Sequence, residues 1–283
     1  MISVLTAGFY TTIQDLGRVG FAHIGVPVSG VMDGYSAQLA NQLLSNSKQD
    51  AVLEITFGTC RFLFEEPQLI CITGADFSPR IDDVSVALNM PLYVEKGTVL
   101  SFGKQQYGVR TYVAVKDGFT SEKVLESRSF YKGVTKEMLL KKGDQLQVAN
   151  LTKIVSKTFA SVKVNKAHFS SKKLCCYEGP EYHLLSESQK NTIQKTLFTI
   201  SKDHSRMGYR LEESIKNNLS SMLTSAVLPG TVQLTPSGEL IVLMRDCQVT
   251  GGYPRVLQLT NAAIDMLAQK TTGDQFRFEL ISL

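Results

Sequence analysis

The sequence is dominated by short runs of strand-forming residues, separated by turns that contain glycine, proline or aspartate. Several such runs follow one another closely between residues 51 and 115. They are Ala51–Phe57, Cys60–Phe64, Gln68–Thr73, Val84–Leu88, Thr98–Phe102 and Val109–Val115. Many short strands at this spacing are typical of a β-sandwich or β-barrel. The sequence therefore predicts a mainly β protein with a few short helices.

Three helices are expected between the strands. Asp33 can cap a helix that runs through about Leu44, because its side chain can accept hydrogen bonds from the first turn. A second helix is expected around Ser186–Thr196, and Thr260 or Asn261 can cap a last one. Further strands are expected at Ile2–Thr6, Gln145–Val148, Leu174–Tyr177 and Gln275–Ile281.

An internal repeat divides the chain into two halves. Gly97 and Gly143 each open a turn that leads into alternating apolar residues, and Gly230 and Gly273 do so in the same order in the second half. Repeats of this kind indicate structurally related units. Chance recurrence of a common turn is the alternative. We expect two related β-rich lobes.

A change of composition between Leu151 and Lys173 marks the expected boundary between the lobes. Six lysines and no acidic residue occur in this stretch. A basic patch for nucleic acid or for an acidic partner is one interpretation, but an exposed linker or a lysine-protected edge strand is favoured. The expected division is a first lobe at residues 1–150 that carries a glycine-rich loop, a crossover at residues 151–173 and a second lobe at residues 174–283.

Charge and composition argue against several classes of protein. The formal net charge of +4 is small for 283 residues, so nucleic acid is not an expected partner. No apolar run approaches the ~20 residues that span a membrane, so no membrane association is expected. The five cysteines are odd in number and lack CxxC spacing. This argues against a zinc site or a disulfide framework and predicts a cytoplasmic protein.

Familiar catalytic motifs are absent from the sequence. It contains no GxxxxGK[ST] phosphate loop, no strand-linked GxGxxG, no HExxH and no GxSxG. The four histidines are too scattered to predict a metal centre. No metal ligand is therefore expected.

The stretch Thr11–Tyr35 is the first candidate for a functional site. It contains five glycines and a proline, so it is expected to be a long ordered loop or a chain of turns. Long loops in compact domains are usually functional, and a surface crossover is the alternative. Its candidate site residues are Gln14, Asp15, Arg18, Ser29 and Asp33.

Three later segments carry similar polar groups. Backbone N–H groups at glycine can approach an anion closely, and arginine can bind carboxylate or phosphate through two parallel hydrogen bonds. A small anionic substrate is therefore expected. The residues are Arg128 in the first segment, Arg206, Tyr209 and Arg210 in the second, and Thr250, Gly251, Gly252 and Tyr253 in the third.

Seven motifs resemble those of a known family. They are TTIQDLGR, GVPVSGVMD, LEITFG, TGAD, SRS, RMGYRLE and TGGYPRV, and the resemblance extends from Leu5 to about Phe278. The family is that of allophanate hydrolase subunit 2, also called the biotin-dependent carboxyltransferase family. It includes the C subunit of 5-oxoprolinase and the antagonist of a sporulation-kinase inhibitor. The resemblance implies two similar cyclophilin-like β-barrel lobes and a separately encoded partner, the B subunit, which resembles the kinase inhibitor. An A subunit is a further candidate partner.

The resemblance implies one favoured function and two alternatives. The favoured function is a subunit of an ATP-dependent 5-oxoprolinase complex, which opens the lactam of 5-oxoproline to give glutamate and is active only with its partner subunit. The alternatives are the carboxyltransferase component of a biotin-dependent urea carboxylase system, and a non-catalytic regulator that binds a histidine-kinase inhibitor. The expected cofactor is ATP with Mg²⁺, bound in the complex. Biotin would have to come from another protein, because the sequence has no AMKM-like biotinylation site.

The resemblance to an ATP-dependent enzyme suggests roles for the candidate residues. Stabilising phosphate charge needs cations, which Arg18, Arg128, Arg206 and Arg210 could supply. Placing Mg²⁺ or water needs a carboxylate, which Asp15, Asp33 or Asp76 could supply. Of these residues, Asp15, Arg18, Asp33 and Arg206 are the expected catalytic ones. The other candidates are expected to contact substrate. Arg18 is expected at the solvent edge, so that its replacement by alanine lowers turnover and leaves stability nearly unchanged.

Two further expectations concern the geometry of the site. The Thr11–Tyr35 loop is expected to line one cleft together with Arg206–Arg210 and Thr250–Tyr253. Glu126 stands where relatives are expected to have a glycine. It is therefore expected to alter or to pair with Arg128.

Overall fold

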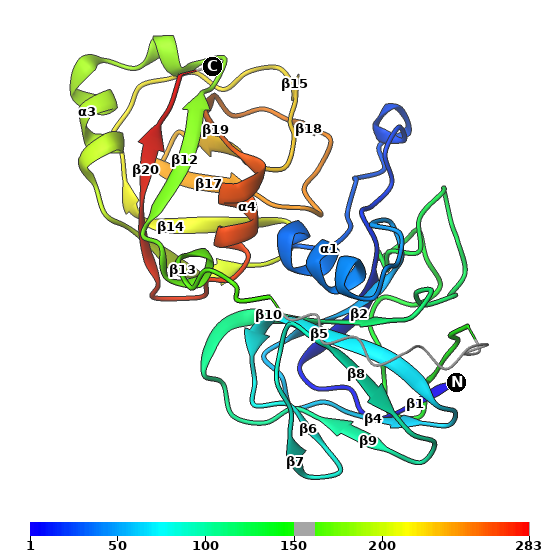
Figure 1. The fold of residues 1–283 in the computed structure, drawn as a ribbon. Coiled ribbons are helices and arrows are strands. Elements are labelled where there is room, and N and C mark those ends of the chain that lie inside the picture. The colour runs from blue at the N-terminus through cyan, green and yellow to red at the C-terminus, as the bar shows by residue number, and fades with distance from the viewer. Residues whose placement is uncertain (150–161, 283) are drawn as a thin grey trace. The chain divides into compact units, whose positions relative to one another are not determined.

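The computed structural model describes residues 1–149 and 162–282, and its contacts divide the chain into two compact units (Figure 1). Unit 1 consists of Met1–Arg18 and Asp33–Lys166, and unit 2 consists of Val19–Met32 and Ala167–Leu283. The expected division placed residues 19–32 in the first lobe. The contacts assign them to unit 2, so the two units do not simply follow one another along the chain.

The expected crossover at residues 151–173 is described only from residue 162 onward. There the chain forms the short helix α2 (Ala167–Ser170) and enters strand β12 (Lys173–Glu178). Residues 151–161 lie outside the described part of the chain. The expected linker at those positions stays a prediction.

Unit 1 contains two sheets. The six-stranded sheet has the order β11-β1-β4-β9-β6-β7, and the five-stranded sheet has the order β2-β3-β10-β5-β8. The strands of the first are β1 (Ile2–Thr6), β4 (Arg61–Phe64), β6 (Arg80–Ile81), β7 (Val84–Ser85), β9 (Val99–Ser101) and β11 (Gln145–Leu146). Those of the second are β2 (Tyr10–Gln14), β3 (Val52–Thr56), β5 (Gln68–Asp76), β8 (Pro91–Val94) and β10 (Tyr107–Val115).

Both sheets contribute to one hydrophobic core. Val4 and Phe62 come from the six-stranded sheet, and Ile13, Leu53 and Val113 come from the five-stranded sheet. Side chains alternate between the two faces of a strand. The residues between these apolar positions therefore lie on the opposite face of the five-stranded sheet.

Helix α1 (Gly34–Leu43) packs against β5 and β10 on that opposite face. Thr73 of β5 donates a hydrogen bond to the carbonyl oxygen of Ser36 at 2.7 Å. Ala37 and Ala40 are buried in the helix, and their small side chains suit close packing on a sheet. The helix therefore covers the β5 and β10 side of this face.

Unit 2 is built around a closed barrel of seven strands in the order β12-β19-β16-β17-β14-β13-β20. The remaining barrel strands are β13 (Phe198–His204), β14 (Gly208–Ser214), β16 (Thr231–Leu234), β17 (Glu239–Leu243), β19 (Arg255–Leu259) and β20 (Gln275–Leu280). Beside the barrel are the two-stranded β15 (Ser225–Ala226) and β18 (Thr250–Gly251), the helices α3 (Glu187–Lys195) and α4 (Asn261–Leu267), and the 3-10 turns η1 (Ala22–Ile24) and η2 (Tyr182–Leu184).

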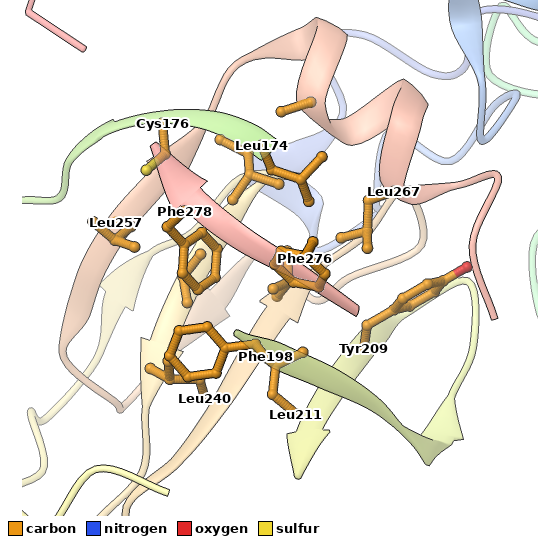
Figure 2. Packing of buried hydrophobic residues seen from close by; sticks show 14 of the residues in the cluster. Leu174, Cys176, Phe198, Tyr209, Leu211, Leu240, Leu257, Leu267, Phe276 and Phe278 are labelled. Atoms are coloured by element: carbon orange, nitrogen blue, oxygen red, sulfur yellow. The ribbon is translucent and has the colours of Figure 1, made fainter. Parts of the chain in front are cut away.

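Aromatic side chains fill the barrel. The ring centroid of Phe278 lies 5.2 Å from that of Phe198 and 5.3 Å from that of Phe276 (Figure 2). Met32 is completely buried in the same cluster. This packing is one physical reason why residues 19–32 belong to unit 2.

The mainly β class predicted from the sequence is confirmed. Unit 2 closes into a barrel, whereas the strands of unit 1 are divided between two sheets. The three expected helices are present, with Asp33, Ser186 and Thr260 as their N-caps. Among the described residues, no helix is long and apolar enough to cross a membrane.

The glycines of the internal repeat occupy similar turns. Gly97, Gly143, Gly230 and Gly273 have φ values of 85°, 94°, 88° and 83°, and each lies one or two residues before a strand. The pairing of these strands differs, because β9 lies between β4 and β6 while β16 lies between β17 and β19. The structural relation between the halves stays a prediction.

The expected irregular stretch at Thr11–Tyr35 is shorter than predicted at both ends, and it is a chain of turns and not one loop. Strand β2 continues to Gln14, the turn η1 occupies Ala22–Ile24, and α1 begins at Gly34. The chain passes from unit 1 to unit 2 after Arg18 and returns after Met32. The glycines of this stretch therefore serve several short connections.

Candidate functional site

Asp15 of unit 1 is the centre of a buried hydrogen-bond network. Its carboxylate accepts hydrogen bonds from the backbone N–H of Gly17 at 2.8 Å and of Arg128 at 2.6 Å. It also accepts from the hydroxyls of Ser127 at 2.6 Å and Ser129 at 2.7 Å. A carboxylate has about four acceptor sites. Three of these donors bind Oδ1 and one binds Oδ2, all from within the fold, so we interpret Asp15 as the anchor of the 127–129 segment.

Arg18 reinforces the same segment. Its side chain donates hydrogen bonds to the carbonyl oxygens of Val124, at 3.2 Å, and Ser129. The expectation that Arg18 lies at the solvent edge is wrong, because it exposes 0% of its surface. The physical reason is that this irregular segment leaves buried carbonyl groups that need donors. Arg128 acts similarly by donating to the carbonyl oxygen of Ser121.

Glu126 does not pair with Arg128 in the described hydrogen bonds. Its carboxylate lies 2.8 Å from the amine of Lys123, which lowers the pKa of Glu126. Leu125 and Glu126 have φ values of 50° and 61°, in a tight turn closed by Val124 and Ser127. Glycine adopts such φ values without strain. This explains why glycine was the residue expected at position 126.

Asp33 caps helix α1. Its carboxylate accepts from the backbone N–H of Ser36 at 3.0 Å and from the Ser36 hydroxyl at 2.6 Å. These are the contacts of an N-cap, which satisfies donors of the first helical turn. We therefore interpret Asp33 as a structural residue.

Replacing Asp33 by alanine is expected to lower the free energy of unfolding by about 1–2 kcal/mol, the usual scale for loss of an N-cap. Urea unfolding followed by circular dichroism measures this change. Asp33→Asn, which keeps a side-chain oxygen, is the matched control and should recover most of the loss. Unchanged stability of the alanine variant would contradict the capping role.

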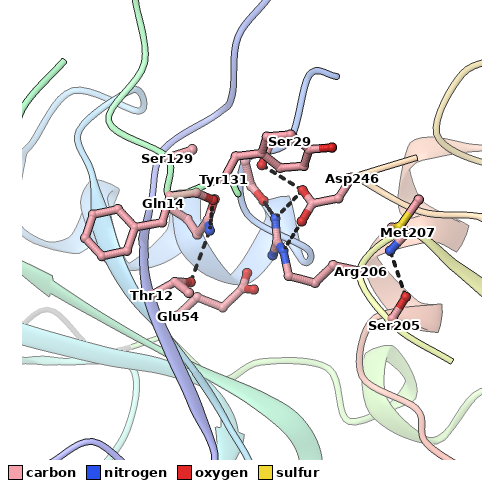
Figure 3. A network of polar contacts seen from close by, with 12 residues as sticks. Thr12, Gln14, Ser29, Glu54, Ser129, Tyr131, Ser205, Arg206, Met207 and Asp246 are labelled. Atoms are coloured by element: carbon pink, nitrogen blue, oxygen red, sulfur yellow. Dashed lines mark hydrogen bonds and ion pairs between the residues drawn. The ribbon is translucent and has the colours of Figure 1, made fainter. Parts of the chain in front are cut away.

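Unit 2 contains a second buried network, centred on Arg206 and Asp246 (Figure 3). Arg206 binds the Asp246 carboxylate through Nε and Nη2, at 2.8 Å and 2.9 Å. Its Nη2 also donates to the carbonyl oxygen of Gly30 at 2.5 Å, and the Ser29 hydroxyl donates to Asp246 at 2.7 Å. Ser29 and Gly30 both have positive φ. The network therefore holds a strained turn of residues 19–32 against the barrel.

An open groove of about 580 Å³ lies on the outside of the barrel in unit 2. Among the predicted residues, Arg210 and Tyr253 line it. Arg210 is half-exposed and binds Glu239 at 2.7 Å, whereas Tyr209 is completely buried in the barrel core. The other lining residues are Lys202, Asp203, His204, Ser205, Met207, Gly208, Gln233, Ile241, Leu243 and Gln248.

The segment Thr250–Tyr253 is shaped by close packing. Thr250 and Gly251 form the short strand β18. A Cβ atom at Gly251 would lie 2.5 Å from the side-chain nitrogen of Gln233, so the Gln233 side chain would have to shift to admit one. Gly252 has more space, with its nearest neighbour, the carbonyl oxygen of Met222, at 3.1 Å. Gly251 thus brings the backbone close to Gln233 at the groove.

The expected cleft is only partly assembled within unit 2. Ser29 and Gly30 contact Arg206 and Asp246, and Arg210 and Tyr253 share the groove. No residue of Thr11–Tyr35 lines that groove. The buried network and the groove are therefore distinct features of unit 2.

A row of polar residues lies on one face of the five-stranded sheet, and only one of its members, Gln14, was predicted from the sequence. Thr12 and Tyr112 are the cross-strand neighbours of Glu54, and Gln14 follows Thr12 on the same face. All four are completely buried. The available signal was an ionisable residue, Glu54, at an alternating position within the apolar strand LEITF. Burying such groups is costly unless a network or a function retains them.

Glu54 and Tyr112 form a defined hydrogen-bonded pair. The Tyr112 hydroxyl oxygen accepts from the backbone N–H of Asp33 at 2.8 Å, so its own proton is donated to Glu54 Oε2 at 2.9 Å. Burial, with the nearby Glu54 and Asp33 charges, raises the pKa of Tyr112 well above its ordinary value. Tyr112 therefore remains a donor at neutral pH.

The five cysteines are free thiols. Burial raises the pKa of Cys60 to about 11, and burial is also the main reason why the pKa values of Cys71, Cys176 and Cys247 rise to about 12. The thiolate is the reactive form. These four cysteines are therefore poor nucleophiles at neutral pH.

Residues 24–280 match the family model of the carboxyltransferase domain, subdomains A and B. The chain belongs to this family. It is 34% identical over its whole length to the C subunit of 5-oxoprolinase from Escherichia coli strain K12, and it covers 92% of that protein. It is 31% identical over its whole length to the corresponding 5-oxoprolinase subunit of Haemophilus influenzae, again covering 92%. The family resemblance predicted from the motifs is confirmed.

Solved structures of larger enzymes contain the same fold. Urea amidolyase of Kluyveromyces lactis matches with a TM-score of 0.88 and 27% identity, covering 99% of this carboxyltransferase-family chain and 19% of the enzyme. Urea carboxylase of the same organism matches with a TM-score of 0.87 and 27% identity, covering 99% of this chain and 27% of the enzyme. The chain thus spans about a fifth to a quarter of these enzymes.

Proposed function

We propose that this chain is one component of an ATP-dependent 5-oxoprolinase complex that opens the lactam of 5-oxoproline to give glutamate. The observation that carries the proposal is the 34% identity over the whole chain to a protein described as the C subunit of 5-oxoprolinase, of which 92% is covered.

The described chemistry supports a small substrate with a carboxylate. The groove of unit 2 is lined by the basic residues Lys202, His204 and Arg210, by Asp203 and by Tyr253. Cationic and aromatic groups around an open groove suit a carboxylate on a small ring. In unit 1, Glu54, Tyr112 and Gln14 supply buried hydrogen-bonding groups of the kind that recognise an amide.

The expected site for Mg²⁺ does not fit Asp15 and Asp33. The carboxylate of Asp15 accepts four hydrogen bonds from within the fold, three of them at Oδ1, and that of Asp33 is engaged by Ser36. Within residues 1–149 and 162–282, no group of three or more histidine, cysteine, aspartate or glutamate residues is arranged to hold a metal ion. Asp15 and Asp33 are therefore not proposed to bind a metal ion. The ATP and Mg²⁺ requirement is proposed for the assembled complex.

The proposed partners are the B subunit of the complex, which resembles a sporulation-kinase inhibitor, and its A subunit. Both bacterial relatives are described as C subunits, and this designation supports a complex of several chains. A cytoplasmic location is proposed with this function.

Reconstitution tests the proposal. The chain alone is expected to release little or no phosphate from ATP, and mixing it with its A and B partners should produce 5-oxoproline-dependent release of phosphate and glutamate. Omitting each component in turn is the control. Full activity of the chain alone, or no activity in any mixture, would contradict the proposal.

A carboxyltransferase is the second candidate, favoured by the fold shared with urea carboxylase at a TM-score of 0.87. It would require carboxybiotin on another protein. Supplying urea and a carboxylated biotin carrier in the same reconstitution distinguishes the two. Urea-dependent loss of the carboxyl group from the carrier, without 5-oxoproline turnover, would favour this candidate.

A further inference from the structure

Gln14, on the polar face of the five-stranded sheet, contains an acceptor that the fold does not use. Its Nε2 donates to Thr12 Oγ1 at 3.1 Å and to the carbonyl oxygen of Phe130 at 3.2 Å. Its Oε1 is buried and has no hydrogen-bond partner among the residues that the structure describes. Leaving a buried acceptor unpaired carries a substantial free-energy penalty. A cost of this size in a completely buried side chain needs a reason.

The orientation of this amide is fixed by its neighbours. The carbonyl oxygen of Phe130 can only accept a hydrogen bond, so the end of Gln14 that faces it must be the NH2 group. Rotating the amide by half a turn would place two acceptor oxygens against each other. The unused atom is therefore an acceptor, and its natural partner is an N–H or O–H donor.

The groups beside Gln14 also present acceptors. Figure 3 shows Thr12, Gln14 and Glu54 close together on neighbouring strands. Glu54 already accepts the Tyr112 proton at Oε2 and is negatively charged when ionised. Diagonal neighbours on adjacent strands have separations of about 7–8 Å, which long side chains can bridge. One small molecule can therefore contact both Gln14 and Glu54.

We propose that this face binds the amide end of a substrate, with Gln14 Oε1 accepting the N–H of a lactam or another unsubstituted amide. The inference rests on the proposed function for the identity of the lactam, 5-oxoproline. Recognition of an N–H group follows from the unpaired acceptor alone. Gln14 is thereby a specificity-determining residue, which separates amides with a free N–H from N-substituted ones.

Burial has a consequence for the kinetics of binding. Thr12, Gln14 and Glu54 expose none of their surface. A ligand can reach them only after the residues that cover this face have moved. Binding is therefore expected to be slower than diffusion, as for sites that open before they accept a ligand.

Two pairs of ligands test the proposal on the assembled complex by isothermal titration calorimetry. The first pair is 5-oxoproline and 1-methyl-5-oxoproline, and the second is 2-pyrrolidinone and 1-methyl-2-pyrrolidinone. In each pair the N-methyl compound should bind the wild-type complex at least about 10-fold more weakly, because Oε1 then lacks its donor. Equal affinities within a pair, or no binding of any of the four, would overturn the proposal.

Variants separate this hydrogen bond from the bulk of the methyl group. In Gln14→Met the affinity for 5-oxoproline should fall about 10-fold. The ratio of its affinity to that of 1-methyl-5-oxoproline should therefore become smaller. Gln68→Met is the matched control, because Gln68 is also buried but its Oε1 accepts the N–H of Leu69 at 3.0 Å. It should keep the full preference. If Gln14→Met unfolds, Gln14→Asn replaces it, because the shorter side chain withdraws the acceptor. An unchanged preference for the free N–H compound over its N-methyl form, in either variant, would overturn the proposal.

The two proposals fail in different ways. Absence of 5-oxoproline-dependent phosphate release, with a retained preference for 2-pyrrolidinone over its N-methyl form, would reject the proposed function and keep the N–H site. Normal phosphate release with no preference within either pair would reject only the N–H site.

Discussion

Asp246→Ala is expected to lower the free energy of unfolding by about 3–5 kcal/mol, because it removes the carboxylate that binds the buried Arg206 guanidinium. The two side chains are only 8% and 9% exposed, and two hydrogen bonds join them. Removing one partner of such a pair costs more than the pair itself contributes. Denaturant unfolding of the purified chain measures the loss.

A half-exposed ion pair in the same barrel provides the control. Arg210 and Glu239 are joined at 2.7 Å, with side chains 44% and 45% exposed. Glu239→Ala should therefore change stability by less than about 1 kcal/mol. Combining Asp246→Ala with Arg206→Met should restore part of the loss, because no unpaired charge remains buried. Equally small losses of stability in Asp246→Ala and Glu239→Ala would contradict the structural role of the Arg206–Asp246 pair.

Asp15→Ala is the second large effect and should cost on the order of 4 kcal/mol. It leaves the hydroxyls of Ser127 and Ser129 and the backbone N–H groups of Gly17 and Arg128 without their acceptor. Hydrogen bonds to a charged group contribute about 1.5–3 kcal/mol each, and losses within one network are not additive. Thermal and denaturant unfolding should both detect the change.

An exposed aspartate with a simpler contact serves as the comparison. Asp274 accepts the backbone N–H of Thr271 at 2.8 Å at the surface. Asp274→Ala should cost about 1 kcal/mol or less. If Asp15→Ala lowered the free energy of unfolding no more than Asp274→Ala, the structural role of the network centred on Asp15 would be refuted.

Local signals explain what the sequence could predict. The cap at Asp33 and the capping box of Ser186 with Gln189 depend on residues three apart, so they are visible in the sequence. The strands likewise follow from alternation and turn residues. The family motifs, which occur along most of the chain, predicted the overall fold.

Contacts between distant segments explain what it could not predict. Asp15 meets Ser127 and Ser129 across more than 110 positions, and Ser29 meets Asp246 across 217. Glycine and charged residues in a row looked like an exposed functional loop, whereas tertiary contacts bury Asp15, Arg18 and Ser29. Glu54 was hidden for the opposite reason, because an apolar strand pattern surrounds it.

The turnover of Asp33→Ala tests most directly whether the buried carboxylates stabilise the fold or act on substrate. This variant removes the mildest of the structural contacts, so the complex should stay folded at room temperature. We expect turnover per folded complex within about threefold of wild type, together with the lowered free energy of unfolding. Turnover lower by on the order of 100-fold, the scale of one lost catalytic contact, with unchanged stability, would contradict the structural role and return Asp33 to the catalytic site.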